Sequence, residues 1–183
     1  MFKILIGVVV VTIAVIGGFL LLDPNSPVRN NSSSGTSTVN EVEESNQITI
    51  TVEGEVYKPG TYTLAEGATM NDLLTAASGV TNNADARAYY ETATLSSGMT
   101  YYIASTYDAN DVCGSTQISK VNINQDDSKT LSGINGISST VADAIVTYRT
   151  SKGAFSTIEQ LQEVYGIGSA TYKKIRNYVI LHE

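Results

Sequence analysis

The pattern of apolar and polar positions begins with one long apolar run. Residues Ile4 to Leu22 contain no charged side chain and consist almost only of Ile, Leu, Val, Ala, Phe and Gly. As a helix, these 19 residues span about 28 Å, close to the roughly 30 Å hydrocarbon core of a bilayer, whereas the apolar part of a secretory signal is usually about 7 to 15 residues long. The pattern therefore predicts an uncleaved transmembrane anchor over residues 1–22.

Charges beside this run predict its orientation. Lys3 precedes the run and Asp23-Pro24 follows it, which by the positive-inside rule favours a cytoplasmic N-terminus and an extracellular C-terminal body. Residues 23–46 are rich in Ser, Asn, Thr and Glu, and their low apolar content predicts a disordered tether. We therefore expect a single-pass protein of the cell membrane.

A different pattern begins at Gln47. Strict alternation over 48–53, followed by 54–64 with a turn at Pro59-Gly60, predicts two strands. A helix capped by Thr69 is expected over 70–77, with short strands at 93–95 and 101–103. Together these elements predict a small α+β domain over residues 47–106.

The residues of this segment carry a resemblance. Val52 to Leu64, followed by Gly67 to Asp72 and by Ala77-Ser-Gly79, resembles the soluble-ligand-binding β-grasp family. The resemblance implies binding of a ligand or glycan, or self-association, and we expect homo-oligomerisation through residues 47–106. The carboxylates form no catalytic group in the sequence and are expected on a solvated surface: Glu53, Glu55, Glu66, Asp72, Asp85 and Glu91.

Composition restricts the possible chemistry of the remaining chain. Residues 107–119 are polar, show no period and are interpreted as a linker. The chain carries a formal charge of -7, but residues 118–183 contain seven basic and six acidic side chains, so only this part offers a plausible nucleic-acid face. Cys113 is the single cysteine, which excludes an internal disulfide or a cysteine-based zinc site. We expect no metal and no cofactor.

Two similar units follow in the C-terminal part. Leu131 to Ile137 and Leu161 to Gly168 are offset by thirty residues between Gly136 and Gly166. Apolar stripes around both units predict four helices in two hairpins, an all-α domain over residues 120–183. A capping box of Ser156 and Glu159 is expected at the start of the third helix.

The Gly166-Ile167-Gly168 loop suggests how such hairpins bind. Glycines allow a sharp turn and a close approach to another molecule, and backbone N–H groups at a helix start favour an anion such as phosphate. Ile167 is expected to point into the core, and Lys173 and Lys174 lie one turn onward. A single loop of this kind could also be a packing turn that binds no ligand. Two such loops at matched spacing favour phosphate binding.

Residues Val121 to Ile180 resemble the helix-hairpin-helix domain of ComEA-type competence DNA receptors. The resemblance implies a surface receptor that grips double-stranded DNA through backbone phosphates, without sequence specificity, and passes it to a membrane channel protein of the uptake machinery. Ser138 stands where that family usually has its second glycine, so the first hairpin is expected to bind more weakly. The expected DNA-binding residues are Gly166, Ile167, Gly168, Lys173 and Lys174, then Gly136, Ile137, Ser138 and Thr140.

Two other functions compete with this interpretation. A DNA glycosylase or nuclease is disfavoured, because the hairpins leave no room for a base-flipping pocket and no carboxylates cluster for metal chemistry. The alternative is an envelope export or assembly protein that uses the hairpin and β-grasp domains to bind a protein or a polysaccharide. The sequence thus predicts a non-catalytic multi-domain protein: an N-terminal transmembrane helix, a β-grasp-like α+β domain and an all-α tandem helix-hairpin-helix domain.

Overall fold

The computed structural model describes residues 46–108 and 116–183, which belong to one compact unit. The predicted anchor, most of the predicted tether and Cys113 lie outside the described residues. Within those two ranges, no helix combines the length and apolar character that a membrane crossing needs. The anchor and its orientation therefore stay predictions from the sequence.

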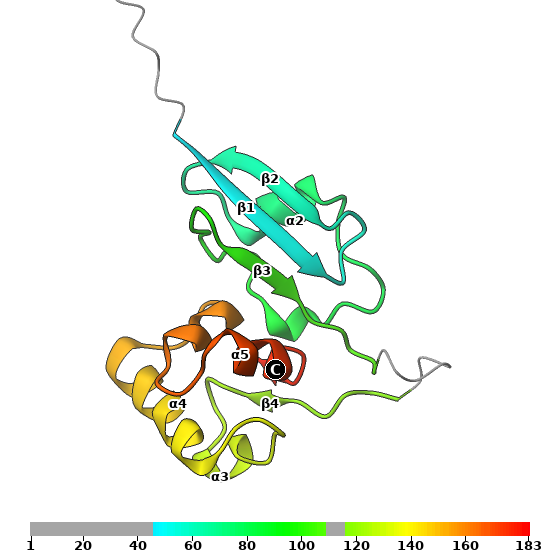
Figure 1. The fold of residues 1–183 in the computed structure, drawn as a ribbon. Coiled ribbons are helices and arrows are strands. Elements are labelled where there is room, and N and C mark those ends of the chain that lie inside the picture. Colours follow the sequence, from blue (N-terminus) through cyan, green and yellow to red (C-terminus); the bar gives the residue numbers. More distant parts are fainter. Residues whose placement is uncertain (1–45, 109–115) are drawn as a thin grey trace, which may run out of the picture. The chain divides into compact units, whose positions relative to one another are not determined.

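Alternating apolar residues build a three-stranded sheet at the N-terminal side of the described chain (Figure 1). Strand β1 (Gln47–Gly54) pairs antiparallel with β2 (Gly60–Ala65) and parallel with β3 (Thr100–Ile103). The buried side chains of β1 pack in one cluster with those of helix α2 (Met70–Ala76). Both predicted strands, the helix and its Thr69 cap are confirmed, but the strand expected at 93–95 is only an isolated bridge between Thr69 and Thr94.

The C-terminal part contains two helical hairpins. Helices α3 (Ser128–Leu131) and α4 (Ser139–Lys152) form the first, and the 3-10 helix η3 (Ile158–Glu163) and helix α5 (Ser169–Ile175) form the second. The prediction of an all-α domain was wrong, because β4 (Val121–Asn122) and β5 (Val179–Ile180) pair in parallel. This two-stranded sheet joins the beginning and the end of the segment around a shared apolar core.

The capping box at η3 differs from the predicted one. Thr157 and Gln160 form it, and the Gln160 Oε1 atom also accepts the Ser156 N–H at 2.8 Å. Glu159 was expected in this role but is 2% exposed. Two overlapping capping patterns start at Ser156 and Thr157, and burial of Glu159 selects the second one.

The ends of the predicted linker are joined to each other. The Ile118 N–H donates to the Thr106 carbonyl at 2.9 Å, and Tyr107 forms an antiparallel bridge with Gln117. Residues 109–115 lie outside the described ranges. Residues 106–107 therefore lie side by side with residues 117–118.

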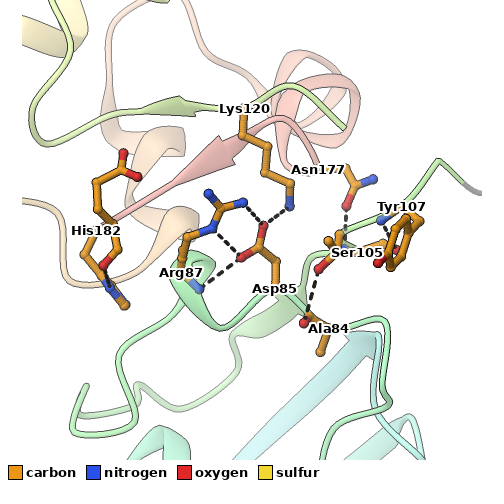
Figure 2. Close-up of polar contacts among 10 residues, drawn as sticks. Ala84, Asp85, Arg87, Ser105, Tyr107, Lys120, Asn177 and His182 are labelled. Carbon is orange, nitrogen blue, oxygen red and sulfur yellow. Dashed lines mark hydrogen bonds and ion pairs between the residues drawn. The ribbon is translucent and has the colours of Figure 1, made fainter. Parts of the chain in front are cut away.

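Below, residues 46–106 are called the β-grasp half and residues 120–183 the hairpin half. A buried ion pair joins them: Lys120 Nζ lies 3.0 Å from Asp85 Oδ2, and Arg87 of the 3-10 helix η2 (Ala86–Ala88) binds the same carboxylate (Figure 2). Burial alone raises the pKa of Asp85, but the hydrogen bonds from Arg87 and Lys120 outweigh it and lower the pKa to about 2. The expectation that Asp85 belongs to a solvated surface was wrong, because it is 3% exposed.

Glu159 is a second buried link between the halves. Its Oε1 atom accepts the Tyr102 backbone N–H at 2.8 Å and the Tyr172 hydroxyl at 2.9 Å. Tyr102 belongs to β3 and Tyr172 to α5, so one carboxylate joins a strand of the β-grasp half to a helix of the hairpin half. Burial raises the pKa of Glu159.

Candidate nucleic-acid interface

The two hairpin loops have the same backbone turn. The Ile137 N–H donates to the Ile134 carbonyl, and the Ile167 N–H donates to the Val164 carbonyl, each at 3.0 Å. In both turns the third residue is a glycine with positive φ, +116° at Gly136 and +90° at Gly166. Such turns need glycine at this place, because a side chain is strained there. The duplication seen in the sequence is therefore a duplication in backbone geometry.

Each loop lies against the helix that follows the other loop. A Cβ atom on Gly136 would lie 3.0 Å from Ile175 Cγ2 and 3.2 Å from Lys174 Cδ, both on α5. A Cβ atom on Gly166 would lie 3.0 Å from Val141 Cγ2 on α4. Lys174 follows the second loop in sequence, but its side chain lies over the first, so this lysine connects the two hairpins.

The central isoleucine of each loop anchors it in the core. Ile137 is 4% and Ile167 is 3% exposed, and both belong to the apolar cluster of the hairpin half. The prediction that Ile167 points inward is confirmed. Because these side chains are buried, the expected contribution of Ile137 and Ile167 to binding is to hold the loop backbone in place, not to touch a ligand.

The two loops differ in their last residue, which is the N-cap of the following helix. Ser138 is the N-cap of α4, and its side-chain oxygen accepts the Val141 N–H at 3.3 Å. Gly168 occupies the matching place before α5, provides no side-chain cap and has open space around a hypothetical Cβ. Its φ of -84° suits any residue. The fold therefore does not require glycine at 168, and the open space there would admit the close approach of another molecule.

Charge is distributed unevenly over the hairpin half. Lys120 and Arg176 form ion pairs with Asp85 and Glu53, and Arg149 donates to the carbonyls of Ile123 and Asp126 at 2.8 and 2.7 Å. These two hydrogen bonds give Arg149 a structural role in the hairpin half. Lys173 and Lys174 are exposed and form no ion pair with any described residue. They leave positive charge free beside both loops, and Thr140 is exposed nearby in the first turn of α4.

The β-grasp half occupies the other side of α5. The Arg176 guanidinium lies 3.7 Å from the centre of the Tyr102 ring and 3.0 Å from Glu53 Oε2. Beside this ion pair lies a cleft of about 310 Å³, and residues of both halves line it, including Lys173, Ser169 and Glu53. Because the Glu53 carboxylate repels phosphate, we place the edge of the candidate interface at this cleft.

Sequence reasoning missed three features of this region. It did not find the buried Glu159, the capping role of Ser138 or the position of His182, whose ring stacks on Tyr90 with ring centres 4.7 Å apart. The serine had a detectable signal, because Ser before a helix is a strong N-cap. Among the described residues, no group of three or more His, Cys, Asp or Glu side chains is placed to hold a metal ion.

Comparison with known proteins adds independent findings. The family model described as helix-hairpin-helix motif matches residues 116–180, and the SLBB domain model matches residues 49–101. The chain is 32% identical over 147 residues to ComE operon protein 1 of Bacillus subtilis, covering 75% of this chain and 72% of that protein. It is also 44% identical over 62 residues to an uncharacterized protein of Haemophilus influenzae, covering 33% of this chain and 55% of that one.

Proposed function

The chain belongs to the family of ComEA-type competence DNA receptors, and from this premise we propose that it binds double-stranded DNA for uptake in natural transformation. The two hairpin loops, with Lys173 and Lys174 beside them, form the binding face. The single observation that carries the proposal is Gly168, a glycine that its own backbone does not need, in open space between a tight turn and two unpaired lysines.

The proposed contacts are to phosphates. Backbone N–H groups of the Gly166–Gly168 loop donate to one phosphate, and Lys173 attracts its neighbour along the strand. Lys174, whose side chain lies over the first loop, attracts a phosphate there. The first loop, with Gly136, Ser138 and Thr140, takes the weaker contact, since the Ser138 oxygen already accepts one N–H group of the first helical turn. Phosphate contacts carry no base information, so binding is without sequence specificity.

The remaining parts of the proposal rest on the sequence. We propose a single-pass anchor at residues 1–22 with a cytoplasmic N-terminus, and an extracellular β-grasp half that mediates homo-oligomerisation. Several tethered copies on one duplex gain affinity through effective concentration. The channel protein of the uptake machinery is the proposed downstream partner, and the chain itself is proposed to bind and not to catalyse.

Gel-shift competition with the full chain tests this function. A labelled duplex is expected to be displaced equally by two unlabelled duplexes of unrelated sequence, and Lys173→Glu/Lys174→Glu is expected to abolish the shift. The charge-matched control is Lys58→Glu/Lys152→Glu, which reverses two exposed lysines away from the loops. Lys152 ends α4, whose 14 residues place it roughly 20 Å from the first loop.

Two results would contradict the proposal. The first is a wild-type chain that shifts no duplex, which would favour the alternative role in envelope assembly. The second is equal loss of binding in both double variants, which would mean that overall charge, not this face, determines binding.

A further inference from the structure

One tyrosine in the second hairpin loop is exposed to an unusual degree. Among the described residues, three large apolar side chains are exposed: Tyr57 at 60%, Tyr165 at 84% and Tyr178 at 41%. Two of the three lie beside hairpin loops. Tyr165 directly precedes Gly166, and Tyr178 lines a hollow of about 170 Å³ with Asn135 and Lys174 at the first loop.

The fold holds Tyr165 in this exposed place. Tyr165 is the second residue of the turn that the Ile167 N–H closes on the Val164 carbonyl at 3.0 Å. Its neighbours Val164 and Ile167 are 4% and 3% exposed, so the backbone on both sides is anchored in the core. No residue of the described ranges forms a hydrogen bond with the Tyr165 side chain, which is 84% exposed. The ring therefore projects from a fixed turn and serves no packing role in the hairpin half.

The position of the ring matters more than its exposure, since single exposed apolar side chains are common. Tyr165 is adjacent to the glycine turn that is proposed to approach a phosphate. Sugars and phosphates alternate along a DNA strand, so a side chain next to the phosphate-binding loop meets a deoxyribose. Tyrosine offers an apolar face with a polar tip, which suits packing on a sugar.

We propose that Tyr165 is a further DNA-contacting residue, whose ring packs on the deoxyribose beside the phosphate held by the second loop. The inference rests on the proposed function and extends it, because it adds an apolar contribution to a face otherwise built from N–H groups and lysines. Such a contact reads no base and releases no counterion. It strengthens binding equally on any sequence and at any salt concentration.

The test uses the full chain in detergent micelles and fluorescent duplexes of two unrelated sequences, titrated at several salt concentrations. Tyr165→Ala is expected to weaken binding about tenfold at every salt concentration, the scale of losing one aromatic stacking contact. The slope of log affinity against log salt stays as in the wild type. Tyr165→Phe keeps the ring and is expected to bind within about twofold of the wild type. Tyr57→Ala, the matched exposed tyrosine of the β-grasp half, is expected to change nothing.

Each outcome decides between separate claims. Tyr165→Ala binding as tightly as the wild type would overturn the inference while leaving the proposed function intact. Tyr165→Phe binding as weakly as Tyr165→Ala would overturn ring packing in the same way. A wild-type chain that binds neither duplex would overturn the proposed function and this inference with it. Thermal unfolding of the Tyr165 variants is expected to match the wild type, because the side chain is 84% exposed.

Discussion

Exchanging the last residues of the two loops is expected to move DNA affinity from one hairpin to the other. In Gly168→Ser, a hydroxyl enters the open space beside the loop and caps α5 as Ser138 caps α4. One hydrogen bond to a charged group is worth about 1.5 kcal/mol, so loss of one phosphate contact lowers affinity about tenfold. Ser138→Gly frees the Val141 N–H and is expected to raise affinity, by at most the same factor.

Stability is expected to move in the opposite direction. Serine and glycine differ by only a few tenths of a kcal/mol as N-caps, so Ser138→Gly is slightly destabilised and Gly168→Ser slightly stabilised. Fluorescence anisotropy with a labelled duplex measures the affinities, and circular dichroism measures unfolding. The double exchange, Ser138→Gly/Gly168→Ser, should return affinity toward the wild-type value.

The reasoning would be refuted by a Gly168→Ser protein that folds and binds as tightly as the wild type. It would also be refuted if Ser138→Gly bound DNA less tightly while its unfolding stayed near that of the wild type. Either result would mean that the open space at Gly168 is not where the phosphate lies.

Three further predictions concern the fold. Gly166→Ala is expected to lose about 1–2 kcal/mol in urea unfolding, because φ is +90° and the new Cβ would lie 3.0 Å from Val141 Cγ2. The raised pKa of Glu159 means that the folded state binds its proton more tightly, so stability is highest below the unfolded value near 4.5 and falls as pH rises through the folded pKa. Glu159→Gln, which keeps an acceptor without the charge, should remove this dependence in denaturation measured from pH 4 to 8. Lys120→Met is expected to lower the free energy of unfolding by about 2–3 kcal/mol in the same assay, because it removes one of the two cations that pair with buried Asp85.

Local patterns predicted the elements well where neighbours in sequence determine them. Alternation in β1, the Thr69 cap of α2 and the inward direction of Ile167 were confirmed, because side-chain period and capping depend on adjacent residues. The same local reasoning chose Ser156 and Glu159 for the cap of η3, and it failed there because two overlapping patterns satisfied the same rule.

Contacts between distant residues could not be predicted from the sequence. Lys120 and Asp85, or Glu159 and Tyr102, meet only when the β-grasp half and the hairpin half pack together. The spacing of apolar residues in the two segments does not indicate that Asp85 and Glu159 are buried. The position of Lys174 over the first loop has the same origin, since it follows from how the two hairpins pack and not from its place after the second.

The salt dependence of duplex binding tests the central claim most directly. The full chain is titrated into two duplexes of unrelated sequence across a series of salt concentrations, beside Lys173→Glu/Lys174→Glu. With about two phosphates neutralised by the two free lysines of one chain, log affinity is expected to fall with log salt at a slope of roughly -2, equally for both sequences, and the double variant is expected to lose binding. Absence of binding at low salt, or affinity that differs strongly between the two sequences, would contradict a receptor that grips the DNA backbone.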